Sequence, residues 1–179
     1  MITTQDMLDH KKKFVFLHID FRSEDADVGY FCTPKNAKII GSTHCDGLHF
    51  CVIPKFGDLV FKVVPDGMSE KYVFPVAKNV TEFLSIVAAL RTTVYFDRMQ
   101  GMSKADFEHF LAEALEGELN DSERLAEVEE FCRTFGVKPY EGSVYDAVMS
   151  LYRSFPYDEI EYTAEYYDVL GLEYPSQTP

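Results

Sequence analysis

The spacing of apolar residues changes once along the chain, near Val76. Before that point, short runs of β-branched and aromatic residues are separated by turn-forming residues, a pattern typical of antiparallel strands. Asp46-Gly47 is the clearest of these turns, because both residues tolerate the positive φ of a two-residue hairpin. The predicted strands are YFCT, AKIIGST, LHFCVI, LVFKVV and KYVFPV. The pattern therefore predicts a β-meander over about residues 28–76.

After Val76 the apolar residues recur at helical spacing. Each of four such stretches follows a residue type that caps helix N-termini: Asn79, Ser103, Asn120 or Asp121, and Ser143. Apolar residues cover most of the circumference of the helix predicted over residues 80–90, so we expect this helix to lie buried on the sheet. The C-terminal run EIEYTAEYYDVLGLEYP, rich in both aromatic and acidic residues, fits either a last strand or a short helix.

Strands followed by helices predict an α+β fold. A mostly antiparallel sheet would pack against about four helices. The chain has 179 residues, a length that supports one well-buried core and is short for two. We therefore expect a single domain over residues 1–179.

The negative charge is concentrated in the second half of the chain. The net charge is −13, and residues 101–179 carry 18 acidic and 5 basic residues, which accounts for the whole excess. Such a block would repel the phosphates of nucleic acids and of anionic membranes. It is compatible with a basic protein partner, and equally with a role in solubility alone.

The candidate partner-binding residues come from this acidic block. Glu123, Glu127 and Glu130 recur at i, i+4 and i+7, a spacing that predicts one outward ridge on the third helix. The ridge is continued by three residues near the end of the second helix: Glu113, Glu116 and Glu118. Like charges at these spacings repel by a few tenths of a kcal/mol per pair. A basic surface that covered the ridge would relieve this small electrostatic repulsion.

The segment HCDGLHFCVI carries the residue types of metal sites and of Cys–His nucleophiles. A two-residue turn at Asp46-Gly47 would place His44 opposite His49, with Cys51 on the same side of the sheet and opposite Ser42. Two imidazoles and a thiolate can bind zinc, but the sequence indicates no fourth ligand, no orienting group and no oxyanion pocket. We therefore predict a structural hairpin, with no catalytic residue, no metal and no cofactor.

The cysteines indicate the compartment. Cys32, Cys45, Cys51 and Cys132 form no CxxC pair and no disulfide-framework spacing. The N-terminal residues lack the features of a secretory signal, and no apolar run is long enough to cross a bilayer. We expect reduced thiols in a cytoplasmic protein that does not bind membranes.

The stretch DGLHFCVIPKFGDLVFKVVP, followed by FPVAKNVTEFLSIVAAL, resembles the SUKH superfamily. This superfamily includes bacterial toxin-immunity proteins and relatives of the fungal cell-wall (glucan synthesis) regulator. The resemblance covers about residues 28–92, while the N-terminal part diverges from the family's pattern. It implies a non-enzymatic, protein-binding α+β domain of immunity or regulatory type, whose basic partner would be a toxin, for example a nuclease. The alternative is a small enzyme or metal-binding protein centred on His44, His49 and Cys51.

Overall fold

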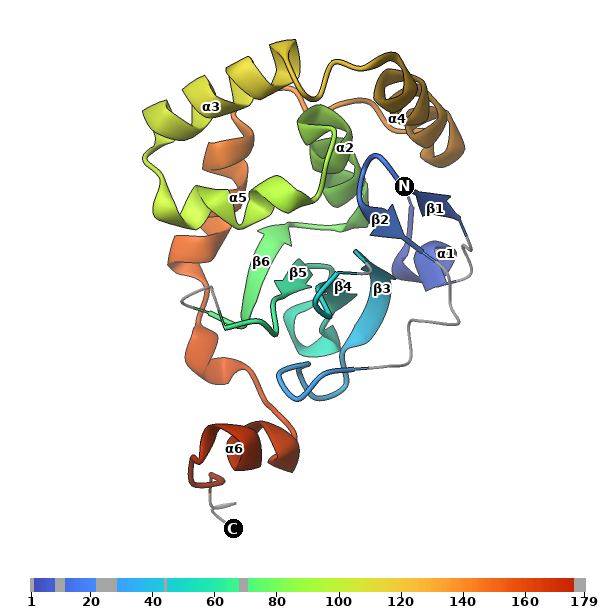
Figure 1. The fold of residues 1–179 in the computed structure, drawn as a ribbon. Coiled ribbons are helices and arrows are strands. Elements are labelled where there is room, and N and C mark those ends of the chain that lie inside the picture. The colour runs from blue at the N-terminus through green and yellow to red at the C-terminus, as the bar shows by residue number, and fades with distance from the viewer. Residues whose placement is uncertain (1, 9–11, 22–28, 44, 68–70, 176–179) are drawn as a thin grey trace.

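The sheet is an antiparallel meander in which each strand pairs with the next strand along the chain (Figure 1). The computed structural model describes residues 2–8, 12–21, 29–43, 45–67 and 71–175. Its strands are β1 (Lys13–Phe14), β2 (Ile19–Asp20), β3 (Lys38–Ser42), β4 (His49–Val52), β5 (Val60–Val63) and β6 (Val73–Ala77). The predicted α+β class and the meander are confirmed. Pro75 is tolerated in β6 because this is an edge strand.

Two parts of the strand prediction differ from the structure. The run YFCT is not a strand but a turn, closed where the amide of Thr33 donates to the carbonyl of Tyr30 at 2.8 Å. The sheet also begins earlier than residue 28, because β1 and β2 form an N-terminal hairpin that pairs Asp20 with Ser42 of β3. These two strands are only two residues long, too short to produce a strand pattern in the sequence.

The Asp46-Gly47 turn is confirmed, but its register was predicted incorrectly. Both residues have positive φ, 49° and 72°, and the amide of Leu48 donates to the carbonyl of Cys45 at 2.9 Å. Ser42 lies opposite His49, however, and Cys51 lies opposite Ile39. The amide of Thr43 donates to the carbonyl of Leu48, so β3 has extra residues before the turn. His44 lies outside the described residues.

Four helices begin and end close to the predicted positions. They are α2 (Val80–Leu90), α3 (Lys104–Glu116), α4 (Ser122–Phe135) and α5 (Val144–Ser154). At each N-terminus the capping side chain accepts a hydrogen bond from the amide of the third residue beyond it; the caps are Asn79, Ser103, Asp121 and Ser143. The helix α4 ends at Gly136, whose φ is 61°, a left-handed conformation that favours glycine.

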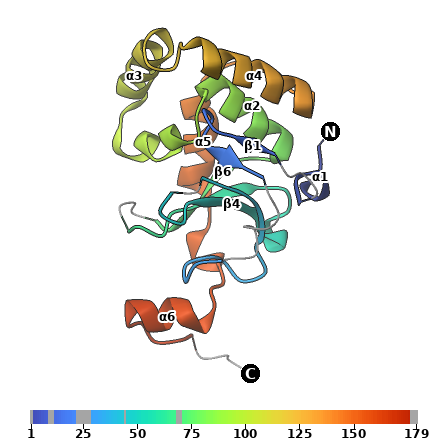
Figure 2. The ribbon, with the colours of Figure 1, turned by 45° about the vertical axis from the view of Figure 1, so that its right-hand side comes forward.

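The remaining helical elements are short. The described residues add α1 (Thr4–Leu8), α6 (Ala164–Leu170), and the 3₁₀ turns η1 (Pro54–Phe56), η2 (Val94–Phe96), η3 (Arg98–Gly101) and η4 (Tyr157–Glu159). The C-terminal run therefore forms a helix and not a strand. In both ribbon views α6 lies at the opposite end of the molecule from α3 and α4 (Figures 1 and 2).

Each face of the sheet is covered by a hydrophobic layer. On one face α2 is buried as predicted: Phe83 and Leu84 are fully enclosed, and the ring centroids of Phe83 and Phe50 are 4.8 Å apart. The other face is covered by the turn around Cys32 and by the segment after α5, through Phe155 and Ile160. No described helix has the length and apolar character that a membrane span requires.

Candidate functional site

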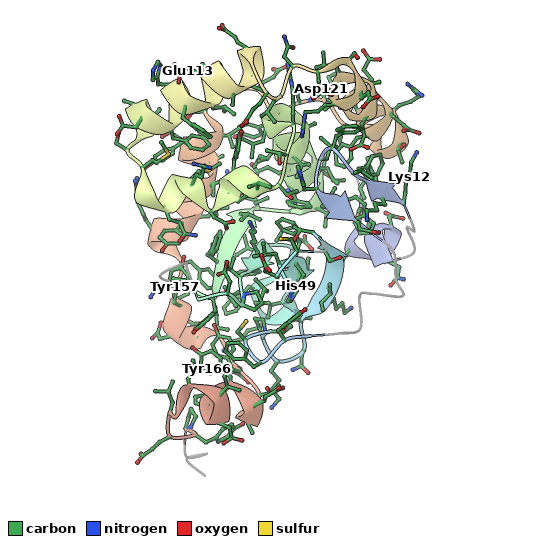
Figure 3. The ribbon with its side chains drawn as sticks, in the orientation of Figure 1. Lys12, His49, Glu113, Asp121, Tyr157 and Tyr166 are labelled. Carbon is green, nitrogen blue, oxygen red and sulfur yellow. The ribbon has the colours of Figure 1, made fainter. Side chains whose placement is uncertain are left out.

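The candidate acidic surface lies on the helices at one end of the molecule (Figure 1). Glu113 and Glu116 lie on α3 and Glu123 lies in the first turn of α4, and all three are exposed. Figure 3 shows Glu113 pointing away from the protein, and its side chain is 71% exposed. Its Oε1 lies 3.5 Å from Nε2 of His109. These three residues therefore form an accessible acidic surface on α3 and α4.

Glu127 and Glu130 make contacts within the protein. The carboxylate of Glu127 accepts hydrogen bonds from the backbone amides of Val15 and Leu17, each at 2.9 Å. Glu130 forms an ion pair with Lys12, which lowers the pKa of the Glu130 carboxyl. Both carboxylates therefore hold the β1–β2 hairpin against α4. Glu127 is partly buried in this contact, whereas Glu130 is exposed, as predicted, although it is paired with Lys12.

Arg124 completes this contact between α4 and the hairpin. Its guanidinium donates to the carbonyls of Phe16 and of Arg91, the latter at 2.9 Å. Arg124, Glu127 and Glu130 recur at i, i+3 and i+6 and so lie on one side of the helix. We call this set, with its partners Lys12 and residues 15–17, the hairpin clamp.

The phase of α4 explains why Glu127 departs from the predicted outward ridge. Phe131 is buried, and Leu125, Val128, Cys132 and Phe135 are partly buried around it. The side of α4 opposite Phe131 carries the exposed residues Ala126, Glu129 and Arg133. Glu127 lies between these two faces, at the edge that contacts the hairpin. Sequence spacing alone located the apolar side of α4 but could not show which edge contacts residues 12–17.

Glu118 is also engaged within the protein. The hydroxyl of Tyr95 donates to the Glu118 carboxylate. Burial, and then this hydrogen bond, raise the pKa of Tyr95 to about 12. Of the six predicted partner-binding residues, all except Glu127 are exposed. Glu118 and Glu130 are exposed but engaged with Tyr95 and Lys12, so we take Glu113, Glu116 and Glu123 as the candidate surface.

His49 has structural partners at both ring nitrogens. Nδ1–H donates to the carbonyl of Gly47 at 2.8 Å, and Nε2 accepts from the hydroxyl of Thr33 at 3.2 Å. The same Thr33 oxygen accepts from the amide of Tyr30, whose ring stacks on the imidazole. His49 is 3% exposed, and burial lowers its pKa. In this arrangement neither nitrogen is available to a metal.

The neighbouring thiols are buried and hard to ionise. Cys32 and Cys51 are fully enclosed, and burial raises the pKa of Cys32 to about 11 and that of Cys51 further. A nucleophilic cysteine requires the opposite shift. All four cysteines are free thiols, and no group of three or more potential metal ligands occurs among the described residues.

An ion pair between a buried lysine and a partly buried aspartate lies on the α2 side of the sheet. Lys62 of β5 is 1% exposed, and its Nζ lies 2.5 Å from a carboxylate oxygen of Asp97. Burial lowers the pKa of Lys62 and raises that of Asp97, while their mutual attraction opposes both shifts. The pair joins β5 of the sheet to the segment between η2 and η3, which indicates a structural role.

The sequence interpretation missed two features of the surface. One is the hairpin clamp, for which the only local signal was the spacing of Arg124, Glu127 and Glu130. The other is a hollow beside α6, where the aromatic C-terminal run meets Lys35, a residue distant in sequence. Comparisons of this chain with protein-family models, curated proteins and solved structures gave no match.

Proposed function

We propose that this chain is a non-enzymatic protein-binding module of immunity or regulatory type. Its partner is a basic protein, such as a nuclease-type toxin. The partner contacts the acidic surface of α3 and α4 formed by Glu113, Glu116 and Glu123. The protein acts in the cytoplasm, where it would neutralise or regulate that partner by occupying its basic surface.

The exposure of these three carboxylates at one end of the molecule carries the proposal. Residues 101–179 hold the entire charge excess, and α3 and α4 present part of it to solvent. A concentrated surface charge speeds the encounter with a partner of opposite charge and repels partners of like charge. The resemblance of residues 28–92 to the SUKH superfamily supports the same class of function.

The alternative function, a small enzyme or metal protein centred on His44, His49 and Cys51, gains no support from the described geometry. Both His49 nitrogens are hydrogen-bonded within the hairpin, and the pKa of the Cys51 thiol is raised by burial. His44 lies outside the described residues. The hairpin's observed contacts are those of a structural element.

The test uses the products of the genes that neighbour the gene for this chain. Each product is expressed alone and together with the chain, and growth and direct binding are measured. We expect one basic product to arrest growth and the chain to relieve that arrest by forming a stable complex with it. If no neighbouring product binds the chain, or if binding does not weaken as salt is raised, the immunity role is contradicted.

A further inference from the structure

A hollow of about 320 Å³ lies beside α6. The helix α6 lies at the end of the molecule opposite α3 and α4 (Figure 2). Its lining combines aromatic rings with charged groups: Lys35, Asp158, Glu161, Tyr162, Tyr167 and Tyr174. A site with aromatic walls and few polar groups is typical of ligand recognition. None of these residues belongs to the acidic surface of α3 and α4.

The aromatic wall of the hollow is held in place by the sheet. The ring of Tyr162 stacks on that of Tyr166 with centroids 3.9 Å apart and planes 10° apart. Tyr166 in turn contacts Tyr72 and Phe31, which pack against the second core of the sheet. The amide of Lys35 donates to the carbonyl of Glu161 at 2.8 Å, which fixes the backbone beneath the wall.

The second wall comes from the C-terminal end of the described chain. Tyr174 packs edge-on against Tyr167, with ring centroids 4.9 Å apart, and Tyr174 remains 49% exposed. Aromatic rings that already pack on one another lower the ordering cost of binding a flat group against them. The hollow therefore favours a planar or extended ligand group.

The charge around the hollow favours a cation. Residues 155–175 carry six acidic residues and no lysine or arginine. The lining itself holds one basic residue, Lys35, against two acidic residues, Asp158 and Glu161. Lys55, outside the lining, is paired with Glu161, with the lysine Nζ 3.2 Å from a carboxylate oxygen. Aromatic faces are themselves electron-rich and attract cations placed over them. Tyrosine faces beside the carboxylate of Asp158 complement a positive group.

We propose that this hollow binds an arginine side chain presented by an extended basic segment of a partner protein. The guanidinium is planar and stacks on aromatic rings, which the compact ammonium of lysine does less well. The guanidinium would lie against Tyr167 and Tyr174, and the Asp158 carboxylate would accept its hydrogen bonds. The site is separate from the acidic surface of α3 and α4, so it stands or fails independently of the proposed function.

The test measures fluorescence anisotropy of a labelled arginine–glycine repeat peptide added to the full chain. Matched peptides replace each arginine by lysine or by citrulline, which keeps the shape of arginine and removes its charge. We expect the citrulline peptide to bind at least about tenfold more weakly than the arginine peptide, with the lysine peptide between them. Equal binding of the arginine and citrulline peptides, or no binding of the arginine peptide, would overturn the proposal.

Variants locate the bound peptide. Tyr167→Leu and Asp158→Asn should each weaken arginine-peptide binding about fivefold or more; Tyr174→Leu, at an exposed position, repeats the test if Tyr167→Leu disturbs folding. The control is Glu113→Gln combined with Glu116→Gln, which removes charge from α3 and should leave binding within about twofold. If only the α3 variant weakened binding, the peptide would be following the acidic surface and the hollow would not be the site.

Discussion

His49 is a buried residue whose protonation is linked to the stability of the fold. Burial lowers its pKa below the ordinary value of 6.5, so at pH values just below 6.5 the unfolded chain binds a proton that the folded chain does not. Stability must then fall as the pH falls through this window. His18 has a pKa lowered chiefly by burial as well, and it contributes in the same direction.

We predict that the free energy of unfolding decreases between about pH 7 and pH 5 and that His49→Gln reduces this slope. Glutamine cannot titrate and retains both a donor and an acceptor for Gly47 and Thr33. Chemical denaturation at a series of pH values measures the slope. Combining His49→Gln with His18→Gln should flatten it further. An unchanged slope in both variants would mean that neither histidine is held neutral by the fold.

Phe83 is the residue on which the packing of α2 depends most directly. Its side chain is fully buried and contacts the rings of Phe50 and Phe96. Phe83→Ala should lower the free energy of unfolding by about 3–5 kcal/mol, as truncation of an aromatic core residue does. Val169→Ala, at a side chain that is 57% exposed, should change it by no more than about 0.5 kcal/mol. A loss below about 1 kcal/mol for Phe83→Ala would contradict the burial of α2 on the sheet.

At the scale of elements, α4 is joined to the N-terminal hairpin by the hairpin clamp. Glu127 satisfies two backbone amides at once, so its removal leaves two donors without their acceptor. We predict that Glu127→Ala lowers the free energy of unfolding by about 2–3 kcal/mol, because hydrogen bonds to a charged group contribute more than neutral ones. Denaturant titration followed by circular dichroism measures this loss.

Glu129→Ala is the matched control for the hairpin clamp. It makes the same chemical change two residues further along α4, on the exposed face, and should alter stability by no more than about 0.5 kcal/mol. Equal effects of the two substitutions would show that Glu127 acts only through helix propensity or net charge. The account of Glu127 as a residue that binds the N-terminal hairpin would then be wrong.

The elements themselves were largely predictable because their signals are local. Asn79, Ser103, Asp121 and Ser143 cap their helices through the amide three residues ahead, so a few residues of sequence contain the whole interaction. The hairpin clamp was not predictable, because Glu127 contacts Val15, which lies 112 positions away. A helical pattern identifies the apolar side of α4 but not the neighbour at its edge.

The predicted register of the β3–β4 hairpin failed for a related reason. The turn at Asp46-Gly47 has a strong local signal, and it forms as expected. The extra residues before it depend on how Thr43 and Leu48 pair, and tight-turn chemistry does not specify that pairing. The consequence for the candidate hairpin site is direct: Ser42, and not His44, lies opposite His49.

The two ends of the molecule are both acidic, but only the α6 end combines its acidic residues with a hollow lined by tyrosines. One end carries α3 and α4, and the other carries α6 (Figures 1 and 3). Exposed glutamates lie on α3 and α4, and the tyrosine-lined hollow lies beside α6. The sheet with its two hydrophobic layers separates the two ends. The sequence showed that the charge excess lies after residue 100, but only the fold shows that it is divided between opposite ends.

The most direct test of the central claim is the association rate of the chain with its basic partner, measured at a series of salt concentrations. Replacing Glu113, Glu116 and Glu123 by glutamine should preserve folding, since all three are exposed. It should slow association at low salt and flatten the salt dependence, because the long-range attraction is lost and the Debye length is only about 8 Å at physiological ionic strength. The control neutralises Glu165, Asp168 and Glu173 at the α6 end, and it should leave the rate nearly unchanged. An unchanged rate for the α3–α4 variant at every salt concentration would contradict the assignment of this surface as the partner-binding face.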